Sequence, residues 1–371
     1  MNKTHTRRGF IRSVAQSAVG VALASRGAFA TARDRSHYVY TSSNAQGDNR
    51  VLVFEQRGNA TLVNVNSVST GGTGLGTNLG SQGALSFSQD GRWLFAVNAG
   101  NDTVSSFAVD DENLTLRSVT STGGVMPISV TSHGHLVYLL NAGGAGNIAG
   151  FRVGHDGTLT PVAGSTQGLG GSAAGPAQVK FSNGGEFLIV TEKTANQIAV
   201  FEVDDGLAQP PTLTPSVGNT PFGFDIDPRD HVIVSEAASA SASSYRLRDR
   251  TDNLAVISAA VPTNQAAPCW LIVTPNGRFA YTGNAGSATI TAFAIRRDGT
   301  LTRTSASGAD GSTGAGSHTI DLAVSDDGQY LYALANVGQT LTAFSIARDG
   351  TLAQTSQFVG VPVSTVGLLA R

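Results

Sequence analysis

A tight turn followed by leucine recurs seven times along this chain of 371 residues, and this repetition constrains the fold more than any other feature. Successive leucines are 45 to 52 residues apart, and most of them follow Asp-Gly or Asp-Asn, which suit tight turns. Each repeat holds short β-rich runs separated by Gly, Asn and Asp, as in antiparallel strands joined by hairpins. Seven four-stranded units at this period predict an all-β fold, a seven-bladed β-propeller. The seven leucines are Leu62, Leu114, Leu159, Leu207, Leu254, Leu301 and Leu352.

The two ends of the chain predict how the ring closes. The first β-rich run, HYVYTSS from His37, matches the second strand of the other repeats, so the first repeat lacks an inner strand. Residues 364–370 have the pattern of an inner strand with no further strand after it. We therefore predict that the C-terminal strand completes blade 1, which leaves only short outer edges unpaired.

The N-terminus has the features of an export signal. Arg7-Arg8 is followed by a weakly apolar stretch at 14–24 and by Ala28-Phe29-Ala30, a small-x-small cleavage site. This order predicts a twin-arginine signal peptide at 1–30 and a single propeller domain at 31–371. The apolar stretch is too short for a membrane span. We expect the mature protein to be periplasmic or secreted.

Charge and cysteine content exclude several classes of partner. Residues 1–30 hold five basic side chains and no acid, so 19 basic and 26 acidic side chains remain, a formal net charge of −7. An acidic surface argues against nucleic acid as a partner. Cys269 is the only cysteine, which rules out an intrachain disulfide and a cysteine-based metal site.

One face of the predicted propeller is the better place for a site. The connections into the inner strands and the loops between strands 2 and 3 share this face, and the Gly/Asp turns share the other. A polar residue begins each of the seven strand 2–3 loops, and such a ring can bind a polyol, a lactone or a cation. The alternative is that each side chain hydrogen-bonds its own loop backbone. The ring consists of Asn44, Asn98, Asn141, Glu192, Glu236, Asn284 and Asn336.

Residues 175–205 and 268–301 resemble units of the seven-bladed lactonase family, and the resemblance extends over 37–371. That family includes bacterial 6-phosphogluconolactonases and the fungal 3-carboxy-cis,cis-muconate lactonizing enzyme. The resemblance implies a propeller fold and a small lactone as substrate.

The resemblance carries over only one of the family's five polar catalytic positions. The family's Gly-Pro-Arg-His run entering blade 4 is Gly175-Pro176-Ala177-Gln178 here, and the family's His entering blade 3 falls at Ile128. Glu192 matches the family's Glu in blade 4, whereas Glu236 takes the place of an Arg in blade 5. Lactone chemistry needs a proton donor or acceptor and positive charge where oxyanion charge develops. Two glutamates without these arginines disfavour an anionic sugar lactone.

Two functions therefore stay open. In the first, a lactonase-like hydrolase or cycloisomerase acts on a small neutral lactone, with Glu192 or Glu236 as base and His318 or Lys193 as proton donor. In the second, a non-catalytic propeller binds a small ligand or an unknown protein partner. No cofactor is expected and no metal ligands are assigned, although a divalent cation at the channel mouth is an open alternative. The predicted ligand-binding residues are Gln178, Lys193, Trp270, Asn284, Asn98 and Asn141.

Overall fold

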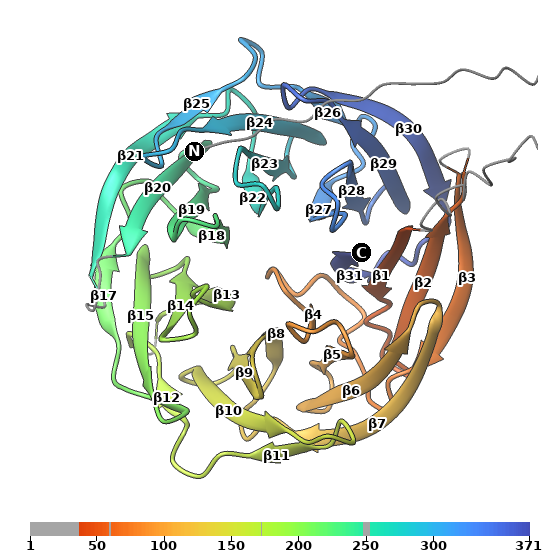
Figure 1. Ribbon diagram of the computed structural model, residues 1–371, viewed down its shortest axis with the longest axis vertical. Coiled ribbons are helices and arrows are strands. Elements are labelled where there is room, and N and C mark those ends of the chain that lie inside the picture. The colour runs from red at the N-terminus through yellow and green to blue at the C-terminus, as the bar shows by residue number, and fades with distance from the viewer. Residues whose placement is uncertain (1–36, 59–60, 172, 248–252) are drawn as a thin grey trace, which may run out of the picture. The chain divides into compact units, whose positions relative to one another are not determined.

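The computed structural model describes residues 37–58, 61–171, 173–247 and 253–371, and these form seven antiparallel sheets arranged as blades around a central channel (Figure 1). The predicted signal peptide at 1–30 lies outside the described residues, as do parts of the turns at 59–60 and 252. The predicted seven-bladed propeller is confirmed.

Each blade takes its strands in chain order from the channel outward, except blade 1. Blade 1 holds β1 (His37–Ser42), β2 (Arg50–Gln56), β3 (Leu62–Ser69) and β31 (Val366–Ala370). Blade 2 holds β4 (Leu85–Phe87), β5 (Trp93–Asn98), β6 (Thr103–Asp110) and β7 (Asn113–Ser121). Blade 3 holds β8 (Pro127–His133), β9 (Leu136–Asn141), β10 (Asn147–Val153), β11 (Leu159–Pro161) and β12 (Gln167–Gly168). Blade 4 holds β13 (Pro176–Phe181), β14 (Phe187–Glu192), β15 (Gln197–Asp204), β16 (Leu207–Ala208) and β17 (Thr212–Pro215).

The remaining blades follow the same plan. Blade 5 holds β18 (Pro221–Ile226), β19 (His231–Glu236), β20 (Ser241–Leu247) and β21 (Leu254–Pro262). Blade 6 holds β22 (Pro268–Val273), β23 (Phe279–Asn284), β24 (Thr289–Ile295), β25 (Leu301–Arg303) and β26 (Gly311–Ser312). Blade 7 holds β27 (Thr319–Val324), β28 (Tyr330–Ala335), β29 (Thr340–Ile346) and β30 (Leu352–Val359). The outer strand is split in blades 3, 4 and 6; in blade 4 the split falls at Pro210-Pro211, which have no N–H to donate to the sheet.

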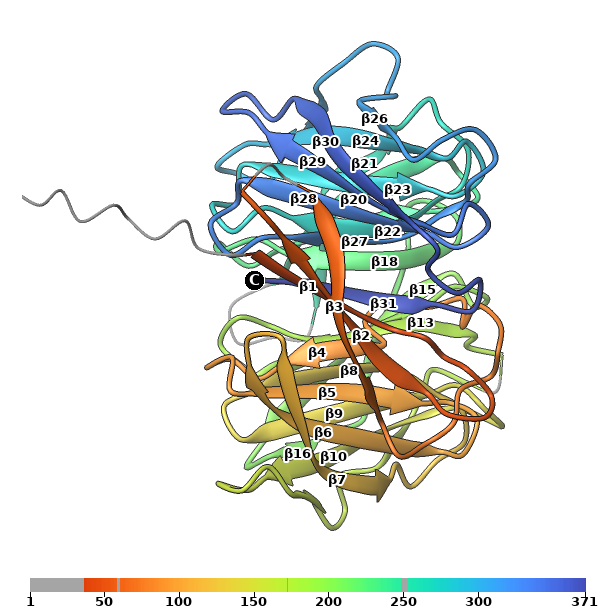
Figure 2. The same ribbon diagram turned by 90° about the vertical axis from the view of Figure 1, so that its right-hand side faces the viewer.

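The C-terminal strand closes the ring, as predicted. Strand β31 pairs antiparallel with β1, with Tyr40 opposite Leu369, and the sheet order is β3-β2-β1-β31. Figure 2 shows β31 running beside β1. The first blade is therefore made from both ends of the described chain.

The apolar core lies between neighbouring blades. Ile189 and Val200 of blade 4, for example, pack with Phe224 and Val234 of blade 5. Buried tyrosine hydroxyls add polar links, because Tyr138 Oη donates to the carbonyl of Gly206 in the next blade at 2.9 Å. Tyr40 and Tyr281 make the same bond to the turns of blades 2 and 7. These three turns are therefore packed against the preceding blade.

Polar side chains of the inner strands join neighbouring blades at the channel. Gln178 Oε1 accepts the N–H of Phe224 in the next blade at 2.7 Å, and Asp225 Oδ2 accepts that of Val273 at 2.8 Å. Asp321 of blade 7 accepts the N–H of Leu368 in blade 1, and burial raises the pKa of this carboxyl well above its ordinary value. These bonds satisfy backbone donors that a free strand edge would leave open.

Candidate functional site

The channel has two different ends. We call the end where the inner strands begin and the strand 2–3 loops lie the loop mouth, and the opposite end, with the hairpin turns, the turn mouth. The residue just before the inner strand has a left-handed backbone in several blades, with φ of +56° at Met126, +63° at Thr220 and +53° at Ala267. His318 holds this place in blade 7, with φ of +64° and an exposed side chain.

Glu192 lies at the loop mouth end of β14 but is completely buried. Its Oε1 accepts the N–H of Gly170 at 2.8 Å, and its Oε2 accepts Gln197 Nε2 at 2.6 Å. Gly170 approaches so closely that a Cβ there would lie 2.6 Å from Oε2. Both carboxylate oxygens are therefore engaged within the wall of the propeller.

Glu236 occupies the same place in blade 5 and is also completely buried. Its Oε1 accepts the hydroxyl of Ser216 at 2.7 Å, and a Cβ at Gly218 would lie 2.6 Å from its Cγ. Burial raises the pKa of Glu236, partly offset by the hydrogen bond from Ser216. No hydrogen bond or ion pair joins the two glutamates, or either one to His318, in the described part of the chain.

The asparagines of the predicted ring are buried in the same way. Asn98, Asn141 and Asn284 have no exposed surface. Their amide groups bind side chains of the adjoining strand 3: Asn98 Nδ2 donates to Thr103 and Ser105, Asn284 Nδ2 to Thr289 and Thr291, and Asn141 Nδ2 to Asn147. These partners are side chains of the next strand rather than the loop backbone of the stated alternative, and a ligand role for the three asparagines stays a prediction.

A segment for which the sequence predicted no role in the site crosses the loop mouth. Residues 79–83, which we call the plug, come from the connection between blades 1 and 2 and extend toward the centre of the ring, ahead of β4 in Figure 1. Gln82 Nε2 donates to the carbonyl of Leu271 at 2.6 Å, and Gln82 Oε1 accepts the Leu271 N–H at 3.0 Å. Since blades 2 and 6 are not neighbours, these bonds span the channel. Ser81 also binds blade 3, through its hydroxyl and the carbonyl of Ile128 at 2.9 Å.

Lys193 and Trp270, both predicted to bind ligand, meet at the plug. Trp270 is buried, and its Nε1–H donates to the carbonyl of Ser81 at 2.9 Å. Lys193 Nζ donates to the carbonyls of Gly80 at 2.6 Å and Pro176 at 3.1 Å. Gln178, the third such residue, is buried and bound to blade 5. The loop mouth therefore gathers these side chains around blades 4 to 6.

The ammonium group of Lys193 has an apolar and partly buried setting. It lies 5.1 Å from the centre of the Phe222 ring, an arrangement that stabilises a cation. Burial lowers its pKa below the ordinary value of 10.5, although Cys269 nearby opposes that shift. Two of its three N–H donors have acceptors in the described structure, which leaves one for a ligand.

Cys269 stands beside this lysine but is unsuited to act as a nucleophile. Burial raises the pKa of its thiol to about 12, despite the nearby Lys193. A thiol with such a pKa is almost entirely protonated near neutral pH, and the thiolate is the reactive form. The described residues contain no group of three or more His, Cys, Asp or Glu placed to hold a metal ion. Among them there is also no helix long and apolar enough to span a membrane.

The fold and the polar loop mouth together define a closed seven-bladed propeller with a lysine at its loop mouth. Three segments of the chain, residues 27–169, 166–269 and 235–365, match the family model described as lactonase, 7-bladed beta-propeller. The chain belongs to this lactonase family.

Solved structures support the same fold. A candidate 6-phosphogluconolactonase from Bacteroides uniformis is 21% identical, with a TM-score of 0.72 over 90% of this chain and 99% of its own. The periplasmic gluconolactonase of Pseudomonas aeruginosa is 18% identical, with a TM-score of 0.69 over 89% of this chain and 98% of its own. No curated protein sequence matches the chain. At such identities the likeness shows the fold alone.

Proposed function

We propose that this propeller binds a small neutral lactone, or the hydroxy acid formed when its ring opens, at the loop mouth. Lys193 is the observation that carries the proposal, because its ammonium group lies at this mouth with an N–H to spare. The lactonase family supports a small lactone as ligand. The Lys193 N–H would donate to the lactone carbonyl, and its charge would attract the carboxylate of the opened acid.

Binding without turnover is the form of this function that the geometry favours. Ring opening by water needs a group that takes a proton from the water within hydrogen-bond reach of the ligand. Glu192 and Glu236 are buried inside blades 4 and 5, where both carboxylate oxygens of Glu192 and one of Glu236 accept hydrogen bonds. Hydrolysis is the second candidate, and it rests on His318, whose exposed imidazole belongs to the same mouth.

Replacing Lys193 with methionine is expected to weaken lactone binding about tenfold or more. A hydrogen bond to a charged group contributes about 1.5–3 kcal/mol, and methionine keeps the length of the side chain without the charge. Calorimetry with a panel of γ- and δ-lactones and their hydroxy acids measures the effect. Acid binding should also weaken as pH rises through the lowered pKa of Lys193, because the ammonium is lost there.

Matched variants separate this proposal from its alternatives. Glu192→Gln and Glu236→Gln keep shape and remove charge, and both should leave ligand affinity unchanged. Equal affinities of Lys193→Met and the parent protein would overturn the proposal. A lactone that is hydrolysed by the parent but not by His318→Asn would establish the second candidate instead.

Export through the twin-arginine route is also part of the proposal. It is supported by Arg7-Arg8 and by the Ala28-Phe29-Ala30 site. Changing Arg7 and Arg8 to lysine should trap the unprocessed chain in the cytoplasm, because the paired arginines are the recognised feature. Cell fractionation with a matched Arg26→Lys control measures this, and normal export of the double variant would refute the assignment.

A further inference from the structure

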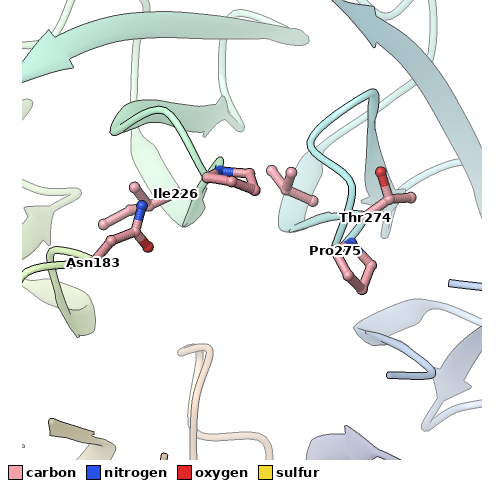
Figure 3. A pocket seen from close by; sticks show the side chains of 6 residues that line it. Asn183, Ile226, Thr274 and Pro275 are labelled. Carbon is pink, nitrogen blue, oxygen red and sulfur yellow. The ribbon is translucent and has the colours of Figure 1, made fainter. Parts of the chain in front are cut away.

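A shallow cavity of about 360 Å³, largely open to solvent, lies at the turn mouth, the end of the channel opposite the proposed lactone site. Its walls come from the first hairpins of blades 4, 5 and 6 and the adjoining inner strands, as Figure 3 shows. Four of its six lining residues are apolar, and the volume falls within the range of small-molecule sites. The lining residues are Asn183, Ile226, Pro228, Val273, Thr274 and Pro275.

A lysine stands beside this cavity. Lys180 lies near the turn mouth end of β13, with its side chain 38% exposed, and its Nζ donates to Asp225 Oδ1 at 2.5 Å. The same carboxylate accepts the N–H groups of Ile226 and Val273, each at 2.8 Å. Both of these residues line the cavity, so Asp225 connects the ammonium group of Lys180 to the backbone of the cavity wall, although Lys180 itself is not a lining residue.

The charges around Lys180 leave it able to bind an anion. Asp225 is held by two backbone N–H groups as well as by the lysine, so its negative charge is shared among three donors. The next acid along the chain, Asp227, forms ion pairs with Arg229 and His231. Only one of the three N–H donors of Lys180 has an acceptor in the described part of the protein.

We propose that the turn mouth binds a small carboxylic acid with a short apolar chain. The carboxylate of the ligand would accept hydrogen bonds from the free N–H groups of Lys180. The apolar part of the ligand would pack against Ile226, Val273, Pro228 and Pro275. A single ammonium group beside an apolar wall suits a monoanion; a phosphate group calls for several donors or an arginine fork. This site is separate from the loop mouth and does not depend on the lactone proposal.

The lysine content of the chain makes a direct test available. Lysine occurs only at positions 3, 180 and 193, so a lysine-specific reagent followed by mass spectrometry distinguishes the two channel mouths. Hexanoate is expected to slow the modification of Lys180 several-fold in the full chain and to leave Lys193 unaffected. Hexanol, which has the chain without the charge, and acetate, which has the charge without the chain, should protect much less.

Calorimetry with matched variants completes the test. Lys180→Met should weaken hexanoate binding about tenfold or more, whereas Lys180→Arg, which keeps the charge, and Lys193→Met should keep most of it. Equal hexanoate affinity in Lys180→Met and the parent, or equal protection of both lysines, would overturn the proposal. If Lys180→Met does not fold, the protection experiment on the parent decides alone.

Discussion

A chain that ends at residue 363 is expected to be insoluble or to melt far below the full-length protein. The deletion removes β31, whose Val366, Leu368 and Ala370 side chains are buried. Burial of a valine or leucine contributes about 1.5–3 kcal/mol each. Strand β1 would also lose its partner on the channel side, and Asp321 would lose the N–H of Leu368. Against a typical total stability of about 5–15 kcal/mol, these losses are large.

Thermal melting and the soluble yield measure this prediction, and a graded variant controls it. Leu368→Ala keeps the strand and its backbone hydrogen bonds, so it should cost only about 2–5 kcal/mol. A synthetic peptide of residues 364–371, added during refolding, should recover part of the folded protein by pairing with β1. A truncated chain that melts with the parent would show that β31 does not hold the ring together.

The fold could be predicted from the sequence because the repeat leaves local signals. The Asp-Gly turns mark hairpins by their backbone preference, and their regular spacing gives the number of blades. The ring closure followed from counting, since the run at His37 had no inner strand and the run at 364–370 had no blade. The structure confirms both predictions.

The accessibility of the polar ring could not be predicted from the sequence. Glu192 and Glu236 have the residue type and the position of a functional pair, and only packing shows that they are buried. The decisive neighbours, Gly170 and Gly218, belong to the preceding connections and approach too closely to admit a side chain. Nothing in a single sequence says which glycine in a glycine-rich loop makes such an approach.

The sequence contains an indication of the plug that the prediction did not use. The connection between β3 and β4, residues 70–84, is long, and β4 has only three residues where the other inner strands have five to seven. A connection of this length can reach beyond the neighbouring blade. The sequence does not show which blade the segment contacts. That contact, with blade 6, depends on the diameter of the finished ring and on the hydrogen bonds between Gln82 and Leu271.

Replacing Gln82 with leucine is expected to destabilise the protein by about 2–6 kcal/mol. Gln82 is buried, and its amide group satisfies both the N–H and the carbonyl of Leu271 across the channel. Leucine has a similar size but satisfies neither group, and each unsatisfied buried polar group costs about 1–3 kcal/mol. Urea unfolding followed by circular dichroism measures the change.

A second glutamine of the same region provides the matched control. Gln46 is exposed and donates a single hydrogen bond to the carbonyl of Leu75, so Gln46→Leu should change stability by no more than about 0.5 kcal/mol. Gln82→Glu adds a test of the geometry, because a protonated glutamic acid can still donate to Leu271 and an ionised one cannot. Burial would raise the pKa of that carboxyl in the folded state, so the variant should approach parental stability as pH falls and lose it as pH rises. If Gln82→Leu unfolds at the same urea concentration as Gln46→Leu, the plug contributes nothing to the ring, and its contacts with blade 6 are incidental.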